Sequence, residues 1–130
     1  MNFYLTDIHA LFWYLINSPL LGAGANSAFD EADNGQARIY IPTIVLAELY
    51  YLNEKKQSPL DFRVKYLRLE QSRQFIMLPF FPRSLLDFDS CKAIKEIHDR
   101  MIVADARRLN VPLITRDVEI TTSGLVQTIW

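Results

Sequence analysis

The chain has few cysteines, few glycines and almost no excess charge of either sign. Its single cysteine, Cys91, excludes an internal disulfide framework, so we interpret it as a small buried thiol suited to a reducing compartment. The net charge of −1 provides no overall basic field, so binding to a polyanion would need a local basic patch. With 4 glycines, 6 prolines and a hydrophobic fraction of 50%, the composition is typical of a globular fold.

The sequence also lacks a run that would span a membrane. Residues 1–16 are apolar, but they include Asp7 and His9, have no basic flank before the apolar run and are too short for a span. We therefore expect no membrane segment and no signal peptide, and a cytoplasmic location. The length of 130 residues predicts a single domain, residues 1–130, large enough to bury its own core.

Short apolar runs that favour strands alternate with longer runs of helical pattern. We predict strands at residues 3–6, 38–41, 75–78, 112–115 and 126–130. We predict helices at residues 10–16, 20–32, 43–55, 83–94 (interrupted) and 99–109, with a turn or short helix at 117–120. A further helix is expected to begin at Ser58 as the N-cap and Pro59 as the first helical residue. This alternation indicates an α/β fold with a parallel sheet covered by helices on both faces.

Two acidic residues directly follow predicted strands. Asp7 ends the segment Tyr4-Leu5-Thr6-Asp7, and Asp117 ends the similar segment Leu113-Ile114-Thr115-Arg116-Asp117. In parallel α/β sheets the working site lies outside the carboxyl ends of the strands, near the point where the strand order reverses. Both acids would lie on one rim if these strands are neighbours. Each acid has a structural alternative as the N-cap of the segment that follows it.

Two more acids lie on predicted helices, on faces that are otherwise apolar. Glu48 is flanked at helical spacing by Val45 and Leu52, and Asp99 shares a face with Val103. The alternative for Glu48 is an exposed acid beside a misjudged helix face. The alternative for Asp99 is a helix N-cap.

Carboxylates gathered on one rim would repel one another strongly unless a divalent cation binds between them. Hard oxygen ligands suit Mg²⁺ or Mn²⁺ better than zinc, and the histidines His9 and His98 lack ligand spacing, so we interpret both as structural. Asp105 is rotated away from the face of Asp99 and can pair with Arg108, so we interpret it as a structural or supporting residue.

The chain resembles the PIN-domain ribonucleases in four segments taken in order, residues 5–13, 46–49, 98–104 and 113–117. The tail at 123–130 is similar to the VapC branch of that family, the toxins of bacterial toxin–antitoxin pairs. The resemblance implies a three-layer α/β/α fold with a five-stranded parallel sheet, homodimers and a small antitoxin that blocks the site. It also implies metal-dependent cleavage of single-stranded RNA, with DNA engaged only through the antitoxin. The family's acidic quartet falls on Asp7, Glu48, Asp99 and Asp117.

Two positions depart from the family pattern. Ile8 replaces a hydroxyl residue that is frequent beside the first acid, which would remove a hydrogen bond that orients Asp7. Asp105 stands where a small hydroxyl residue is common, which would add negative charge near the site.

We therefore predict a phosphodiester hydrolase that uses Mg²⁺ or Mn²⁺ to activate water and to stabilise charge on the phosphate. Asp7 and Asp99 would be the principal metal ligands, and Glu48 and Asp117 would bind through water or a second ion. Arg116 is a candidate phosphate contact, with a surface arginine as its alternative, and Arg100 is a weaker candidate.

Basic and aromatic side chains are candidates for holding RNA. The basic set is Arg63, Lys65, Arg68, Arg73, Arg107 and Arg108, whose alternative is a solvated surface. The aromatic set is Trp13, Tyr50 and Tyr51, whose alternative is the core or a dimer interface. Two rival functions stay open: a non-catalytic PIN-like binding module that engages an antitoxin and, through it, operator DNA, and a carboxylate–Mg²⁺ phosphatase acting on small phosphate esters.

Overall fold

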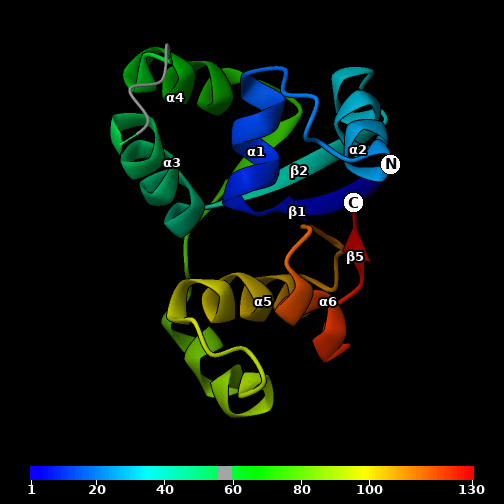
Figure 1. The fold of residues 1–130 in the computed structure, drawn as a ribbon, viewed down its shortest axis with the longest axis vertical. Coiled ribbons are helices and arrows are strands. Elements are labelled where there is room, and N and C mark those ends of the chain that lie inside the picture. Colours follow the sequence, from blue (N-terminus) through cyan, green and yellow to red (C-terminus); the bar gives the residue numbers. More distant parts are fainter. Residues whose placement is uncertain (56–59) are drawn as a thin grey trace.

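The computed structural model describes residues 1–55 and 60–130, and its centre is a sheet of five parallel strands (Figure 1). The strands are β1 (Asn2–Thr6), β2 (Ala37–Pro42), β3 (Phe75–Leu78), β4 (Leu113–Ile114) and β5 (Thr128–Ile129). They lie in the order β3-β2-β1-β4-β5, and every neighbouring pair is parallel. The predicted five-stranded parallel sheet is therefore confirmed.

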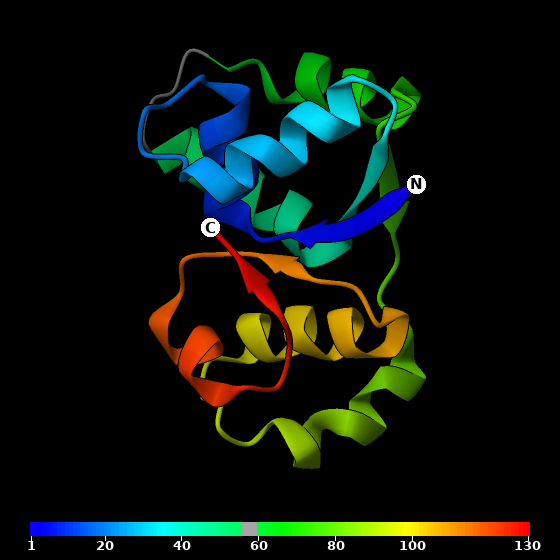
Figure 2. The ribbon, with the colours of Figure 1, turned by 90° about the vertical axis from the view of Figure 1, so that its right-hand side faces the viewer.

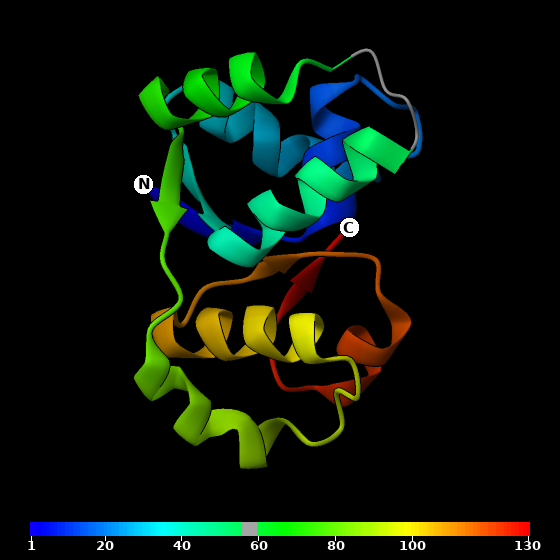
Figure 3. The same ribbon diagram turned by 90° about the vertical axis from the view of Figure 1, so that its left-hand side faces the viewer.

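Helices cover the sheet in two layers (Figure 1). One layer holds α1 (Ile8–Leu15), α2 (Ala23–Asp33), α3 (Thr43–Lys55) and α4 (Phe62–Gln71). The other holds the 3₁₀ helix η1 (Pro82–Cys91), α5 (Ile97–Leu109) and α6 (Val118–Ser123), as the side view in Figure 3 shows for η1 and α5. The three-layer α/β/α architecture is confirmed.

The chain reverses its direction of travel across the sheet at β1. It moves outward from β1 through β2 to β3, and then crosses to the other side of β1 to form β4 and β5. Leu5 pairs with Tyr40 of β2 and with Leu113 of β4, so the carboxyl ends of β1 and β4 lie side by side. This is the position at which parallel α/β sheets carry their ligand sites.

The core forms where the central strands are covered by both helical layers. The residues Leu5, Ile39, Ile41, Leu113 and Ile114 of β1, β2 and β4 are fully buried. Their continuous apolar pattern arises because both faces of a parallel sheet lie against helices. Cys91 is buried and forms no disulfide, as predicted, and its thiol donates to Asp87 Oδ2 at 3.7 Å.

Element boundaries agree with the predictions where local pattern alone determines them. The helix at 43–55 and the strand at 75–78 begin and end at the predicted residues. The helix predicted at 20–32 begins later, at Ala23, with Gly22 as its N-cap. A Cβ atom on Gly22 or Gly24 would lie 2.6 Å from an atom of Trp130, so both glycines serve the packing of the chain end against α2.

Helix α4 also differs from the predictions. The N-cap of α4 is Asp61, which accepts a hydrogen bond from the backbone of Val64, and the predicted cap at Ser58 and Pro59 lies outside the described residues. Arg73, predicted on this helix, follows its end. Within residues 1–55 and 60–130, no helix is both long and apolar enough to cross a membrane.

Candidate functional site

Asp7 and Asp117 lie on the same rim of the sheet, at the carboxyl ends of the neighbouring strands β1 and β4. A single side chain joins them. Thr115 Oγ1 donates a hydrogen bond to Asp7 Oδ2 at 2.5 Å and accepts one from the backbone N–H of Asp117 at 3.1 Å. Thr115 is itself buried, so the link is shielded from water. The sequence analysis did not assign a role to Thr115.

Both of these acids also cap helices. Asp7 Oδ1 accepts the backbone N–H of Ala10 at 2.9 Å, at the start of α1, and Asp117 Oδ1 accepts that of Ile120 at 2.9 Å, at the start of α6. The capping alternatives therefore hold for both residues, and capping orients each carboxylate at the rim. Burial raises the pKa of Asp7, and the hydrogen bonds from Thr115 and Ala10 oppose this shift.

Glu48 approaches the rim from α3, and Asp99 approaches it from the first turn of α5 in the other helical layer. Both side chains are half-buried. The N-cap of α5 is Glu96, whose carboxylate accepts the backbone N–H of Asp99 at 2.8 Å. The capping alternative for Asp99 is therefore wrong, and its carboxylate is not needed to begin the helix.

The pKa shifts at the rim indicate that Asp7 and Asp99 each lie within electrostatic range of the other three carboxylates. Burial raises the pKa of Glu48 to about 7, and the charges of Asp99 and Asp7 add to the shift. Burial also raises the pKa of Asp99 to about 6, with added effects from Asp117 and Asp7. Such shifts mean that the fully ionised cluster is unfavourable without a compensating positive charge.

The donor set fits a hard divalent cation in chemistry but does not form a ready-made coordination sphere. All four side chains offer carboxylate oxygens, and Glu48 Oε1 is buried without a hydrogen-bond partner in the described part of the chain. Across residues 1–55 and 60–130, no three acidic, histidine or cysteine side chains lie close enough together to hold an ion as they stand. A cation would have to draw these side chains inward.

A hollow of about 450 Å³ lies beside Glu48 and is lined also by Ile8, His9 and His98. His98 Nδ1 lies 3.3 Å from an oxygen of Glu96, and the ring of His9 packs 5.5 Å from that of Trp13. These contacts agree with the interpretation of both histidines as structural.

Of the two candidate arginines, Arg116 is the better placed. It is exposed and its guanidinium lies 4.4 Å above the ring of Trp13, next to Asp117 in the chain. Arg100 instead donates to the carbonyl of Ile94 at 2.7 Å and lies over an aromatic ring, so it is held by the chain itself. The Trp13 side chain is buried, which agrees with its core alternative.

The two departures from the family pattern have different outcomes. The hydroxyl that Ile8 lacks is supplied to Asp7 by Thr115. Asp105 is fully buried, with Arg108 Nη2 at 3.7 Å from Oδ1. The ion pair with Arg108 agrees with the interpretation of Asp105 as a structural residue, and its effect on the charge of the site stays a prediction.

The basic and aromatic sets do not form single surfaces. Arg63 and Arg68 are exposed on α4, whereas Arg107 and Arg108 lie on α5 in the other helical layer. Tyr50 and Tyr51 on α3 are exposed, with their rings 6.0 Å apart, so the core alternative is wrong for these two. Tyr51 also lines the hollow beside Glu48.

Comparisons with known proteins agree with this architecture. The family model described as "PIN domain" matches residues 4–122. No curated protein sequence matches the chain. Among solved structures, VapBC2 from Rickettsia felis bound to a promoter DNA fragment is 18% identical, with coverage of 97% of this chain and 96% of that chain and a TM-score of 0.71.

Two further structures share the fold. VapBC from Salmonella typhimurium bound to DNA is 17% identical, covers 98% of this chain and 97% of that chain, and has a TM-score of 0.72. The Mycobacterium tuberculosis toxin VapC20, described as cleaving the sarcin–ricin loop, is 13% identical, covers 98% and 99%, and has a TM-score of 0.66. At these identities the likeness is one of fold.

Proposed function

The chain belongs to the PIN-domain family, and from that premise we propose that it is a metal-dependent endoribonuclease that cleaves single-stranded RNA and acts as the toxin of a VapC-type toxin–antitoxin pair. The observation that supports this proposal is that four carboxylates lie along one rim of the sheet, where a cation would have to draw them together. They come from two strand ends and two helices, and the pKa values of three of them, Asp7, Glu48 and Asp99, are raised by burial.

Asp7 and Asp99 would be the principal ligands of Mg²⁺ or Mn²⁺, and Glu48 and Asp117 would bind through water or a second ion. The bound ion supplies a water of lowered pKa and positive charge beside the phosphate oxygens. Thr115 keeps Asp7 turned toward the rim through its 2.5 Å hydrogen bond.

Proton transfer and phosphate binding would fall to the chain's own side chains. Glu48, half-buried beside the hollow and with Oε1 unpartnered among the described residues, would take the proton from the water that attacks phosphorus. The oxygen–phosphorus bond to the leaving ribose would break as the new one forms, and the leaving oxygen would take a proton from solvent. Arg116, supported on the ring of Trp13, would contact the scissile phosphate.

Two features support RNA as the substrate and an antitoxin as the partner. The exposed ring of Tyr51 lines the hollow beside Glu48, and that of Tyr50 lies 6.0 Å from it, so unpaired bases could stack there. The structural neighbours include toxin–antitoxin complexes bound to DNA and an RNA-cleaving toxin. We propose that this chain likewise binds an antitoxin, forms a homodimer, and contacts DNA only through the antitoxin.

The test is cleavage of a labelled single-stranded RNA by the purified chain with Mn²⁺ or Mg²⁺, with EDTA, and with the variant Asp99→Asn. The matched control is Asp89→Asn, because the side chain of Asp89 is 93% exposed and lies outside the rim. We expect cutting that EDTA and Asp99→Asn abolish and that Asp89→Asn leaves intact. Absence of cutting under every condition would favour the non-catalytic binding module, and hydrolysis of small phosphate esters alone would favour the phosphatase.

A further inference from the structure

We propose that a second cavity binds a phosphate group carried by a nucleotide or by an RNA strand. This cavity lies at the ends of the strands opposite to those that carry the acids. The cavity has a volume of about 910 Å³ and lies between η1, the last turn of α5 and the segment before β5. Pro112 and Gln127, which precede β4 and β5, line it, so it lies at the amino ends of these strands. Figure 2 shows β4 (orange) lying above α5 (yellow).

The lining of this cavity is basic in a chain whose net charge is −1. Three arginines, Arg83, Arg107 and Arg108, line it together with the carboxylate of Asp87. Arg107 is paired with Asp87, and Arg108 lies 3.7 Å from the buried carboxylate of Asp105, so the excess positive charge is that of Arg83. Arginine stays charged at all physiological pH values, and its planar set of donors matches the oxygens of phosphate, so Arg83 and the free donors of the other two favour an anionic ligand.

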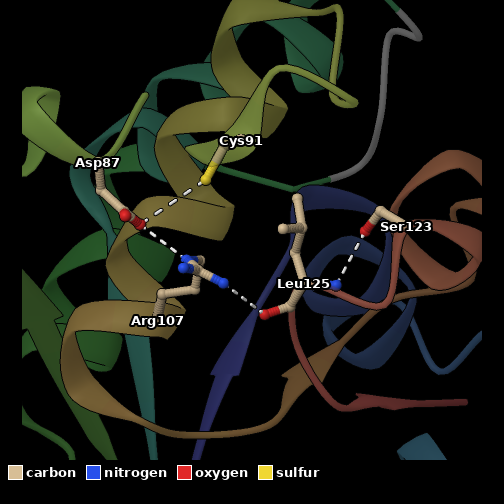
Figure 4. Close-up of polar contacts among 5 residues, drawn as sticks. All are labelled: Asp87, Cys91, Arg107, Ser123 and Leu125. Carbon is tan, nitrogen blue, oxygen red and sulfur yellow. Dashed lines mark hydrogen bonds and ion pairs between the residues drawn. The ribbon is translucent and has the colours of Figure 1, made fainter. Parts of the chain in front are cut away.

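One of these arginines is held in place by the chain. Arg107 Nε donates to Asp87 Oδ2 at 2.7 Å, and Nη1 donates to the carbonyl of Leu125 at 3.1 Å (Figure 4). These bonds use two of the five N–H donors of the guanidinium, which leaves three for a ligand. Because the side chain is already fixed, binding would lose little rotational entropy.

A buried hydroxyl supplies an independent sign of a ligand. Ser84 lines the same cavity and its side chain is 6% exposed, yet Oγ has no hydrogen-bond partner among residues 1–55 and 60–130. A buried hydroxyl without a partner is unfavourable, and most such groups in proteins are satisfied. A phosphate oxygen in the cavity would accept this hydrogen bond.

Arg108 adds a donor face, and apolar residues supply the rest of the wall. The guanidinium of Arg108 lies 4.4 Å over the ring of Phe81, which fixes its plane at the end of α5. Leu86, Val111 and Val126 also line the cavity. Its volume is within the range of small-molecule sites, and a mixed wall of this kind suits a phosphate that carries an apolar or aromatic body.

A purely structural role for Arg107, joining η1 to α5 and to Leu125, accounts for its own bonds. It does not account for Arg83 or for the unpaired Ser84 hydroxyl. The phosphate site accounts for all of these groups together.

The test is an NMR titration of the full chain in EDTA, without divalent cations, so that the outcome does not depend on nuclease activity. The probes are inorganic phosphate, AMP, and an RNA oligonucleotide with or without a terminal phosphate. We expect amide shifts at Ser84, Val111 and Gln127, and we expect Arg83→Gln to weaken binding about tenfold. The matched control is Lys92→Gln, an exposed lysine outside the lining of the cavity, which should bind as the parent does.

The arms of the titration identify the source of the phosphate. Binding of AMP at least as tight as that of RNA assigns the site to free nucleotides, and preference for RNA assigns it to the strand. Ser84→Ala serves as a second variant and should also weaken binding. Absence of binding by all probes, shifts confined to the acidic rim, or unchanged binding by both Arg83→Gln and Ser84→Ala would overturn the proposal.

Discussion

Replacing Asp105 with asparagine should stabilise the protein, and only above acidic pH. Asp105 is fully buried, and neither carboxylate oxygen has a hydrogen-bond partner in the part of the chain that the structure describes. Arg108 Nη2, at 3.7 Å, is its ion-pair partner. Burial raises the pKa of Asp105 from 3.8 to about 6, and Arg108 opposes part of that shift.

The sign and size of the effect follow from proton linkage. Between pH 3.8 and about 6 the folded chain holds a proton on Asp105 more tightly than the unfolded chain does. The free energy of unfolding therefore falls as the pH rises through this window and is constant above it. A pKa difference of about 2 corresponds to about 3 kcal/mol. Asparagine has nearly the same shape and stays neutral, so Asp105→Asn removes this penalty.

The assay is urea unfolding of the parent and the variant at pH 4.5 and pH 8, in EDTA. We expect Asp105→Asn to raise the free energy of unfolding by about 2–3 kcal/mol at pH 8 and by less than about 1 kcal/mol at pH 4.5. The exposed control Asp89→Asn should change neither value by more than about 0.5 kcal/mol. A variant that is less stable than the parent at pH 8, or a gain that does not depend on pH, would refute the reasoning.

Three further changes test other parts of the structure. Glu48→Gln removes a carboxylate whose pKa burial raises to about 7, so in EDTA at pH 8 the melting temperature of the variant should be higher than that of the parent. Added Mg²⁺ should raise the melting temperature of the variant less than it raises that of the parent. Thr115→Val removes the hydrogen bond to Asp7 and should lower both the free energy of unfolding, by about 1–2 kcal/mol, and the rate of RNA cleavage, and Thr115→Ser should restore both. Gly24→Ala would bring a Cβ atom to 2.6 Å from the carbonyl oxygen of Trp130 and should lower the free energy of unfolding in urea by about 1–3 kcal/mol.

The parallel fold was predictable because its signals are local. A short apolar run predicts the strand at 75–78, and apolar residues at helical spacing predict the helix at 43–55. The start of α2 was not predictable in the same way. Gly22 and Gly24 look like weak helix residues in the sequence, but their role is to admit Trp130, which is more than one hundred residues away.

The site was predictable in part. An acid directly after a strand marks Asp7 and Asp117, since neighbouring parallel strands bring their carboxyl ends to one rim. The cap of α5 was misjudged because Asp is the better N-cap by type, whereas the chain uses Glu96. Thr115 was missed because its role is a hydrogen bond to Asp7, which is distant in the sequence, and no local spacing indicates such a contact.

The central place of β1 has a consequence for how the protein is made. During synthesis β1 can pair with β2 early, but it can pair with β4 only after the chain has reached residue 114. Asp7 likewise gains its hydrogen bond only when Thr115, 108 positions later in the sequence, has been made. At translation rates of 5–20 residues per second, that delay is roughly 5–20 s on the ribosome. A nascent chain that stops short of Asp117 therefore has no complete rim of acids, and for the proposed nuclease the ability to cut RNA would arise only after Asp117 has been added to the chain.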